Sequence, residues 1–538
     1  MNLLEVAGDL FKVETLDERF LPDKLPSPEP KKPLAQRLEL VFRVMVDSLF
    51  VFAMFRIAMS AADPQVNSKY FDYKILLSPG WMGPEVDNTD SQYAGFRSNL
   101  GVLLIIMTLH CLFRVLLRFN KGQKRSYYDF VTSLHVFGLH GTGGFKIFII
   151  VVLNYYIGKW FRNRTASWIF LMTILFANEF TEGFYTTDAF EFGSLLPHWH
   201  IFFKCTLLRM LSFNVDRLEA DQAQTELEPK PIPNREEYRR TGTPRPLEEY
   251  NFINYVGYCL YLPLYIGGPI ITFNDFRSQI STPTTGTSVK RVIMYAIRFV
   301  FCFLVLEFIL HNIPAPAMIK ARAWVGLSPA QISMISFFGL IIIWLKLLIP
   351  WRMFRLWALV DRIDPPENMV RCVSNNYSTS SFWRSWHRSF NKWAIRYIYL
   401  PLGGAKHSIR NAAIVFFFVA LCHDMQLNLF VWGFLSVIFV LPEAICKFMF
   451  PNKIYSKYWW WKYVCGVGGV LNIWAMLLAN LVGFAIGVDG AKMVMKDLAE
   501  TSAGLWFVIL SSIVLFEGTQ CMFDFRAREL RRGIDMKC

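Results

Sequence analysis

Residues 331–349 read Gln-Ile-Ser-Met-Ile-Ser-Phe-Phe-Gly-Leu-Ile-Ile-Ile-Trp-Leu-Lys-Leu-Leu-Ile, an apolar run in which Lys346 is the single charged residue. At about 1.5 Å per helical residue, a run of this length covers roughly 30 Å, the thickness of the hydrocarbon core of a bilayer. A surface helix of a soluble protein would instead carry a polar face. The stretch therefore predicts a helix that crosses a membrane.

Ten further stretches have the same apolar character. They lie at 40–61, 99–117, 145–160, 166–178, 251–272, 291–312, 411–422, 427–449, 463–487 and 503–523. Some are short or interrupted, as at Pro263 and Pro269, and such segments can be re-entrant where protein satisfies the freed backbone groups. We expect an all-α polytopic membrane protein with roughly eleven transmembrane or re-entrant helices.

Composition agrees with a membrane protein and excludes other classes. Of 538 residues, 54% are hydrophobic and 18% are charged, against roughly a quarter charged in soluble domains. The net charge of +14 comes from cations in short loops between the apolar stretches, as the positive-inside bias produces, so no nucleic-acid partner is expected. The ten cysteines are scattered without a CxxC pair, which supports neither a disulfide framework nor a zinc site.

The loop charges predict orientation and domain organisation. Segment 62–96 is mostly acidic and 118–125 is basic, so we place 62–96 outside the cytosol and both termini inside it. The expected domains are a polar, Pro-rich cytosolic segment at 1–38, a transmembrane domain at 39–523 and a basic cytosolic tail at 524–538. Within the transmembrane domain, 216–250 is expected to be a hydrophilic loop and 371–404 an interfacial region.

The interfacial region carries a regular pattern of charge. If it is one helix, four cations at i, i+4 spacing form a stripe, opposite an aromatic face with His387 at its edge. The stripe consists of Arg384, Arg388, Lys392 and Arg396, and the aromatic face of Trp386, Phe390, Trp393 and Tyr397. One interpretation is a helix that contacts only lipid head groups. The other is a grip on a phosphate-bearing cosubstrate, with His387 pointing toward buried chemistry.

Several ionisable residues lie within or beside apolar stretches. His423 follows the apolar run 411–422, and a histidine there can accept and donate protons near neutral pH. The alternative is a hydrogen-bonded core histidine, since the chain has nine histidines. Glu307 and His311 would share a helix face and could relay protons, although structural pairing inside the bundle is the simpler interpretation.

Longer strings carry a family resemblance. The string Ser381-Phe382-Trp383-Arg384-Ser385-Trp386-His387, the run 396–401 and His423 resemble the membrane-bound O-acyltransferase superfamily. Within it the chain is most similar to the fungal glycerol-uptake (Gup) proteins, over nearly its whole length, and it is related to Hedgehog acyltransferase. Further matching strings lie at 81–92, 267–275, 344–352 and the Lys537-Cys538 ending. The resemblance implies helices around a central catalytic tunnel.

The resemblance also implies an activity. A long fatty acyl group would move from acyl-CoA to a hydroxyl of a lipid acceptor, which for Gup proteins is the lyso form of a glycosylphosphatidylinositol (GPI) anchor. His423 matches the near-invariant histidine of the superfamily and would be the general base, while His387, 36 residues earlier, would position the hydroxyl or polarise the thioester. Cys422 stands where the superfamily commonly has Trp. The implied location is the endoplasmic reticulum membrane, with the plasma membrane as a second location.

Three substrate contacts and one cofactor ligand follow from the same resemblance. Arg384 and Lys392 would hold the CoA phosphates, and Trp383 would pack against the acyl chain near the thioester. Cys372 matches a cysteine that binds haem in the Hedgehog-acylating branch; no other metal ligand is expected.

Two other functions stay open. A proton-coupled glycerol transporter would use Glu307, His311 and Lys346 as its ionisable path. A protein acyltransferase of the Hedgehog- or Wnt-acylating type would keep the same fold and modify a polypeptide.

Overall fold

The computed structural model describes residues 33–119, 122–180, 195–196, 199–224, 236–282, 284–423, 427–532 and 534. The first 32 residues of the predicted N-terminal segment and the Lys537-Cys538 ending lie outside this range. The described part is almost entirely helical, with one antiparallel hairpin formed by β1 (Leu77–Pro79) and β2 (Glu85–Asp87). The expected all-α class is confirmed.

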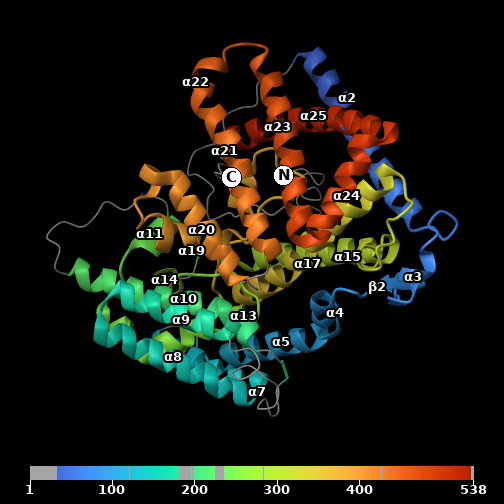
Figure 1. Cartoon of the computed structure of the whole chain (residues 1–538). Coiled ribbons are helices and arrows are strands. Elements are labelled where there is room, and N and C mark those ends of the chain that lie inside the picture. Colours follow the sequence, from blue (N-terminus) through green and yellow to red (C-terminus); the bar gives the residue numbers. More distant parts are fainter. Residues whose placement is uncertain are drawn as a thin grey trace.

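The helices follow one another along the chain in the order that Figure 1 colours. The first half contains α2 (Leu34–Ala61), α3 (Tyr70–Lys74), α4 (Ser91–Ser98), α5 (Leu100–Leu116), α6 (Gly122–Ser133), α7 (His135–His140), α8 (Thr142–Phe161), α9 (Arg164–Phe180), α10 (Trp199–Ala223), α11 (Glu236–Gly242), η3 (Leu247–Glu249), α12 (Phe252–Cys259), α13 (Leu262–Tyr265), α14 (Phe273–Ser281) and η4 (Thr285–Thr287). The second half contains α15 (Val289–Asn312), α16 (Ala315–Lys320), α17 (Pro329–Val360), α18 (Thr379–Ser385), α19 (Arg388–Ala394), η5 (Ile395–Tyr399), η6 (Gly404–His407), α20 (Ser408–Cys422), α21 (Leu427–Met449), α22 (Asn452–Tyr455), α23 (Trp461–Asn480), η7 (Leu481–Ala485), α24 (Gly487–Glu500) and α25 (Ser502–Arg531).

Seven helices of the described chain are long and apolar enough to cross a bilayer. An eighth span results if α4 and α5, which are bent by 53° to each other, form one broken span. Three of the eleven expected stretches are not among them: 40–61 is part of α2, 166–178 lies in the 17-residue α9, and 251–272 is divided between α12 and α13. The chain is a multi-pass membrane protein, with seven or eight candidate spans among the described residues.

Helix α17 occupies the centre of the molecule. It is 32 residues long, and 67% of its apolar window is buried, the largest share among the seven helices. A capping box starts it: the Ser328 hydroxyl accepts from the Gln331 N–H, and the Gln331 side-chain oxygen accepts from the Ser328 N–H. Figure 1 shows α17 between the C-terminal helices α21–α25 and the helices α5–α10. Helix α17 packs against α2, α13, α15 and α16 and also against η7, α24 and α25.

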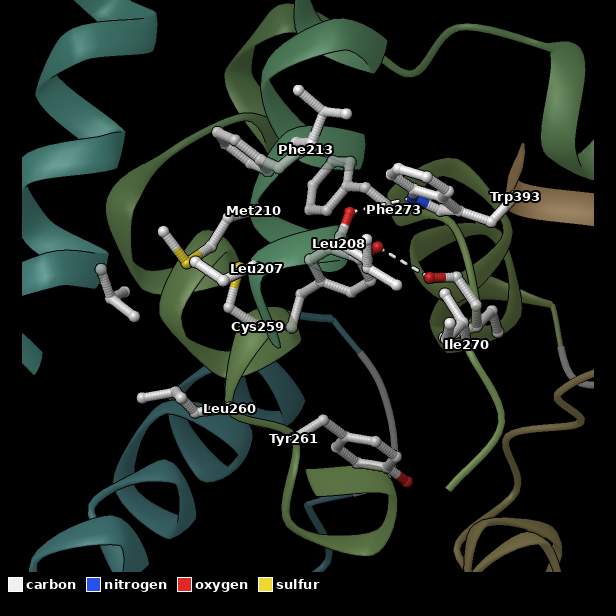
Figure 2. Packing of buried hydrophobic residues seen from close by; sticks show 14 of the residues in the cluster. Leu207, Leu208, Met210, Phe213, Cys259, Leu260, Tyr261, Ile270, Phe273 and Trp393 are labelled. Carbon is white, nitrogen blue, oxygen red and sulfur yellow. Dashed lines mark hydrogen bonds between the residues drawn. The ribbon is translucent and has the colours of Figure 1, made fainter. Parts of the chain in front are cut away.

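The core beside α10 anchors the region that carries the motif strings. Trp393, on α19, inserts its indole among buried residues of α10 and α14 (Figure 2). Its Nε1 donates to the Leu208 carbonyl and to the Ser212 hydroxyl, both at 3.0 Å. Phe213 and Phe273 pack edge to face nearby, with ring centroids 4.8 Å apart. The motif region is therefore fixed to a helix about 180 residues earlier in the chain.

Two predicted segments differ in extent from the structure. Residues 216–223 of the expected hydrophilic loop continue α10, and Asp216 is fully buried. Residues 524–531 of the expected tail continue α25. A polar sequence can continue a helix when its charged side chains have partners. This holds at the end of α10, where Asp216 pairs with Arg396, and at the end of α25, where Glu529 pairs with Arg371.

Candidate functional site

The region 371–404 is not one helix. Helix α18 ends at Ser385, Trp386 is extended (ψ 131°), and His387 takes the left-handed conformation with φ 41° and ψ 50°. That conformation costs a non-glycine residue about 1–2 kcal/mol. Asn368 compensates, because its carbonyl accepts from the Arg388 N–H at 2.9 Å and its Oδ1 accepts from the next N–H at 3.2 Å. The backbone is thus turned sharply at the histidine that the resemblance singled out.

The imidazole of His387 lies between two aromatic rings. Trp351 of α17 stacks on one side, with ring centroids 4.5 Å apart and planes 23° apart. Phe390 stacks on the other side at 5.4 Å and 26°. Burial lowers the pKa of His387 to about 3, and the positive charge of a protonated His423 contributes in the same direction. His387 is therefore neutral at physiological pH and close enough to His423 for the two to interact electrostatically.

His423 lies where α20 ends. Its N–H donates to the Val419 carbonyl at 3.2 Å, its own backbone is extended, and its side chain is exposed. Asn411, on α20, ties the helix back to the motif region by donating to the carbonyls of Leu402 and Gly404 at 3.3 and 2.9 Å. The structure thus brings together two histidines that lie 36 residues apart in the sequence.

Trp383, on α18, packs against helices α20 and α21. Its ring is 5.8 Å from that of Phe416 on α20 and 5.2 Å from that of Trp432 on α21, both edge to face. Its carbonyl accepts from the Asn391 side chain at 2.8 Å, across the turn at His387. The indole therefore forms part of an apolar wall next to the helix that carries His423.

The continuous cationic stripe is wrong, because the helix on which it was drawn is broken. Arg388 is buried, and Arg396 is paired with Asp216 at 3.0 Å and Glu219 at 2.7 Å. Arg384 is exposed and Lys392 is partly exposed. Two of the four cations are therefore structural, and the two that were singled out for phosphate contacts are the accessible ones.

Asn368 was missed by sequence reasoning, since nothing in its neighbourhood marks it. It is fully buried, 19 residues before His387. It acts together with Ser389, whose N–H it accepts and whose hydroxyl accepts from the Ile270 N–H at 2.9 Å. Ile270 belongs to the matching string 267–275, so the structure gives that string a packing role beside the turn.

The groups proposed for a transport path have structural partners. Glu307 is fully buried and accepts from the Trp81 indole at 2.7 Å, the Tyr93 hydroxyl at 2.8 Å and Arg97 at 3.0 Å. His311 is bonded to the Glu307 carbonyl at 2.6 Å. Lys346 pairs with Asp90. This arrangement supports the structural interpretation of the pair.

Cys372, the expected haem ligand, is partly exposed. Its Sγ lies 3.4 Å from the Ser374 hydroxyl, and the side chain packs against the core around α15 and α17. Cys372 lines neither the cavity beside Tyr128 nor the cavity beside Cys521. No step of the chemistry below involves haem.

One group of side chains has metal-ligand spacing that the sequence did not suggest. His110, Cys111 and Asp361 are buried, with potential ligand atoms within 4.8 Å of one another. However, Asp361 already pairs with Arg114 at 2.5 Å and with Arg125. Two guanidinium groups beside the carboxylate repel a cation. The cluster is better explained as an ion-pair network that joins α5, α6 and the end of α17.

Comparisons with known proteins agree with these motifs. A model of the MBOAT, membrane-bound O-acyltransferase family, matches residues 150–488. The "Membrane-bound O-acyltransferase GUP1" of Candida tropicalis is 43% identical over 566 residues, covering 100% of this chain and 97% of that protein. The protein of the same name from Saccharomyces cerevisiae is 41% identical and is covered over 100% of both chains. "Protein-cysteine N-palmitoyltransferase HHAT" of Mus musculus is 26% identical over 203 residues, 35% of this chain and 39% of its own.

Proposed function

Because this chain belongs to the membrane-bound O-acyltransferase family, we propose that it moves a long-chain acyl group from acyl-CoA to a hydroxyl of a lipid acceptor. The observation that carries the proposal is the nearness of a partly buried, neutral His387 to an exposed His423 at the end of a candidate membrane-spanning helix. An alcohol is a poor nucleophile at its own pKa, so its acylation needs a positioned base.

His423 is the general base in this proposal. Its neutral imidazole takes the proton of the acceptor hydroxyl while the hydroxyl oxygen forms a bond to the thioester carbonyl carbon. The carbon–sulfur bond then breaks, and the CoA sulfur leaves with the proton that His423 holds. An exposed side chain suits this role, because a base must reach both substrates.

His387 is the positioning group. Its pKa of about 3 keeps it uncharged, so it presents one N–H donor and one acceptor nitrogen. The stacking partners Trp351 and Phe390 fix the plane of the ring. A neutral donor with a fixed direction can stabilise negative charge on the thioester oxygen without reorganising.

The donor substrate is held by the accessible part of the motif region. We assign the CoA phosphates to Arg384 and Lys392, since Arg388 and Arg396 are buried or paired. Trp383 contacts the acyl chain at the thioester end, as its position in the apolar wall with Phe416 allows. Haem ligation by Cys372 stays a prediction without geometric support.

The acceptor that fits best is lyso-GPI in the endoplasmic reticulum membrane. Support comes from the full-length similarity to relatives named O-acyltransferases. The similarity to relatives named protein N-palmitoyltransferases is weaker, at 26% identity over 35% of the chain and 21% identity over 82% of it, which makes a protein acceptor the second choice. Proton-coupled glycerol uptake is the third, because Glu307 and Lys346 are engaged in ion pairs.

The test uses the full chain purified into lipid nanodiscs with a clickable long-chain acyl-CoA. We expect label in lyso-GPI only when acceptor and enzyme are both present, and we expect His423→Ala to abolish it. His407→Ala is the matched control, since His407 is exposed at the start of the same helical segment. Label in polypeptide instead of lipid would refute the acceptor class, and wild-type turnover by His423→Ala would refute the base.

A further inference from the structure

The α21–α23 turn, residues 447–463, joins two helices that are both candidate membrane spans. It contains the end of α21, the short helix α22 and the start of α23. Figure 1 shows α22 at the upper edge of the molecule, beyond the helices that it connects. Because both neighbouring helices are long enough to cross a bilayer, the turn lies at a membrane face.

Large aromatic side chains cover the α21–α23 turn. Phe448 and Trp459 are 86% and 82% exposed. Behind them, the ring of Tyr455 lies 5.2 Å from that of Trp461, whose Nε1 donates to the Asn452 side chain at 2.9 Å. The turn is therefore folded on itself and presents aromatic rings outward. Tyr and Trp side chains are enriched at the boundary between bilayer and water.

The same turn carries positive charge and no negative charge. Its cations are Lys447, Lys453, Lys457 and Lys462. No Asp or Glu occurs between Glu443 and Asp489. Lys447 pairs with Glu443, whereas in the part of the chain that the structure describes none of the other three lysines pairs with a carboxylate. Two of these three are exposed and Lys462 is partly exposed, so they are available to an anion from outside the protein.

The turn lies on the same face of the protein as the end of α25. The Lys462 carbonyl accepts from the Gln520 side chain at 3.4 Å, and the ring of Tyr463 stacks on that of Phe516 with centroids 6.4 Å apart. Helix α25 continues from there to Arg531, toward the tail that loop charge predicts to be cytosolic. The cytosolic leaflet contains anionic lipids, which attract lysines close to its surface.

We propose that the α21–α23 turn binds the head groups of anionic phospholipids. Lys453, Lys457 and Lys462 contact the phosphate and the other acidic groups, while the exposed aromatic rings enter the boundary of the acyl chains. A second copy of the chain is a poor occupant, because it would bring three more lysines to the same surface. An acidic soluble protein would match the charge but not the exposed rings. The proposal concerns binding alone and does not depend on acyl transfer.

The experiment uses the purified full chain in phosphatidylcholine nanodiscs that contain the same trace amount of one of two photoactivatable lipids. One is a phosphatidylserine and the other a phosphatidylcholine, each with a diazirine at the same position near the ester. After irradiation, mass spectrometry measures the label within residues 447–463. We expect at least about fivefold more label from the phosphatidylserine, the ratio that one lysine near a charged surface supplies. The ratio should shrink in about 0.5 M salt, where charges are screened.

Substitution of the three lysines tests which groups are responsible. The variant Lys453→Gln/Lys457→Gln/Lys462→Gln removes the charges and should bring the two lipids to equal labelling. The corresponding triple substitution to Arg keeps the charges and should keep the preference. A preference for phosphatidylserine that persists in the Gln variant would overturn the proposal. Equal labelling of the wild type by the two lipids at low salt would overturn it in favour of an acidic protein partner.

The matched control removes three lysines from other surfaces. Lys74→Gln/Lys492→Gln/Lys496→Gln changes the net charge by the same amount, on α3 and α24, and all three lysines are exposed. The control should keep the wild-type preference for phosphatidylserine within the turn. Loss of the preference in the control, or crosslinks between two protein copies in place of lipid label, would also overturn the proposal.

Discussion

Loss of one partner from the ion pair between Arg371 and Glu529 is expected to be among the most destabilising single charge changes in the described part of the chain. Arg371 Nη1 and Nη2 donate to the two Glu529 oxygens at 3.1 and 2.8 Å, and the side chains are only 3% and 9% exposed. Arg526 is 3.7 Å from the same carboxylate. Glu529→Gln removes the carboxylate charge that the buried Arg371 guanidinium faces. Breaking a buried pair in this way costs about 3–5 kcal/mol.

The matched control is Glu500→Gln. Glu500 pairs with Lys496 at 3.9 Å, and both side chains are about two-thirds exposed, so its loss costs at most about 1 kcal/mol. The double variant Arg371→Met/Glu529→Leu removes both charges and should recover most of the lost stability, since an apolar replacement of a buried pair is often neutral.

The assay is denaturant unfolding in mixed micelles, followed by tryptophan fluorescence. The expected order of unfolding free energies is wild type and Glu500→Gln, then the double variant, then Glu529→Gln. The reasoning is refuted if Glu529→Gln is no less stable than Glu500→Gln, or if the double variant is as unstable as Glu529→Gln. Either result would mean that α25 is not held to the motif region through a buried charge.

Three further outcomes are expected. The folded-state pKa of His387 is about 3 and its ordinary value is 6.5, so between these values the folded protein binds fewer protons than the unfolded chain. The contribution of His387 to stability is therefore full above about pH 6.5 and falls as the pH is lowered toward 3. The unfolding midpoint of His387→Phe should depend less steeply on pH in this window than that of the wild type. Arg384→Gln should raise the KM for acyl-CoA about fivefold and weaken its salt dependence, whereas the exposed control Lys406→Gln should leave the KM unchanged in the same kinetic assay. Glu307→Gln should lower the free energy of unfolding by about 3 kcal/mol, because Arg97 loses its buried partner. Acyl transfer per folded molecule should be unchanged. Retained stability together with a loss of proton-coupled glycerol flux would instead support a transporter.

The local pattern of hydrophobic residues was sufficient to predict most of the candidate membrane spans. Hydropathy depends only on neighbouring residues, so the apolar runs 145–160, 291–312 and 331–349 predict α8, α15 and α17 correctly. The run 251–272, whose interruptions include Pro263, forms two short helices, as is possible for the re-entrant or broken segments that such interruptions indicate.

Non-local contacts explain what the sequence could not predict. The stripe from Arg384 to Arg396 assumed one helix, but Asn368 accepts two N–H groups at the turn and the helix is broken there. The sequence pattern left Arg396 available to bind phosphate, but in the structure it pairs with Asp216, which lies 180 residues earlier in the chain. Helical periodicity carries no information about either contact. The nearness of His387 and His423 was likewise expected from the family resemblance and not from spacing.

The central claim is that His387 and His423 act on the same reacting thioester and hydroxyl. The most direct measurement is single-turnover acyl transfer by His387→Ala, His423→Ala and the double variant, each in nanodiscs with lyso-GPI and acyl-CoA. Groups that work as a unit give non-additive losses, so the double variant should be no slower than the slower single variant. Rate losses that multiply in the double variant would contradict the account.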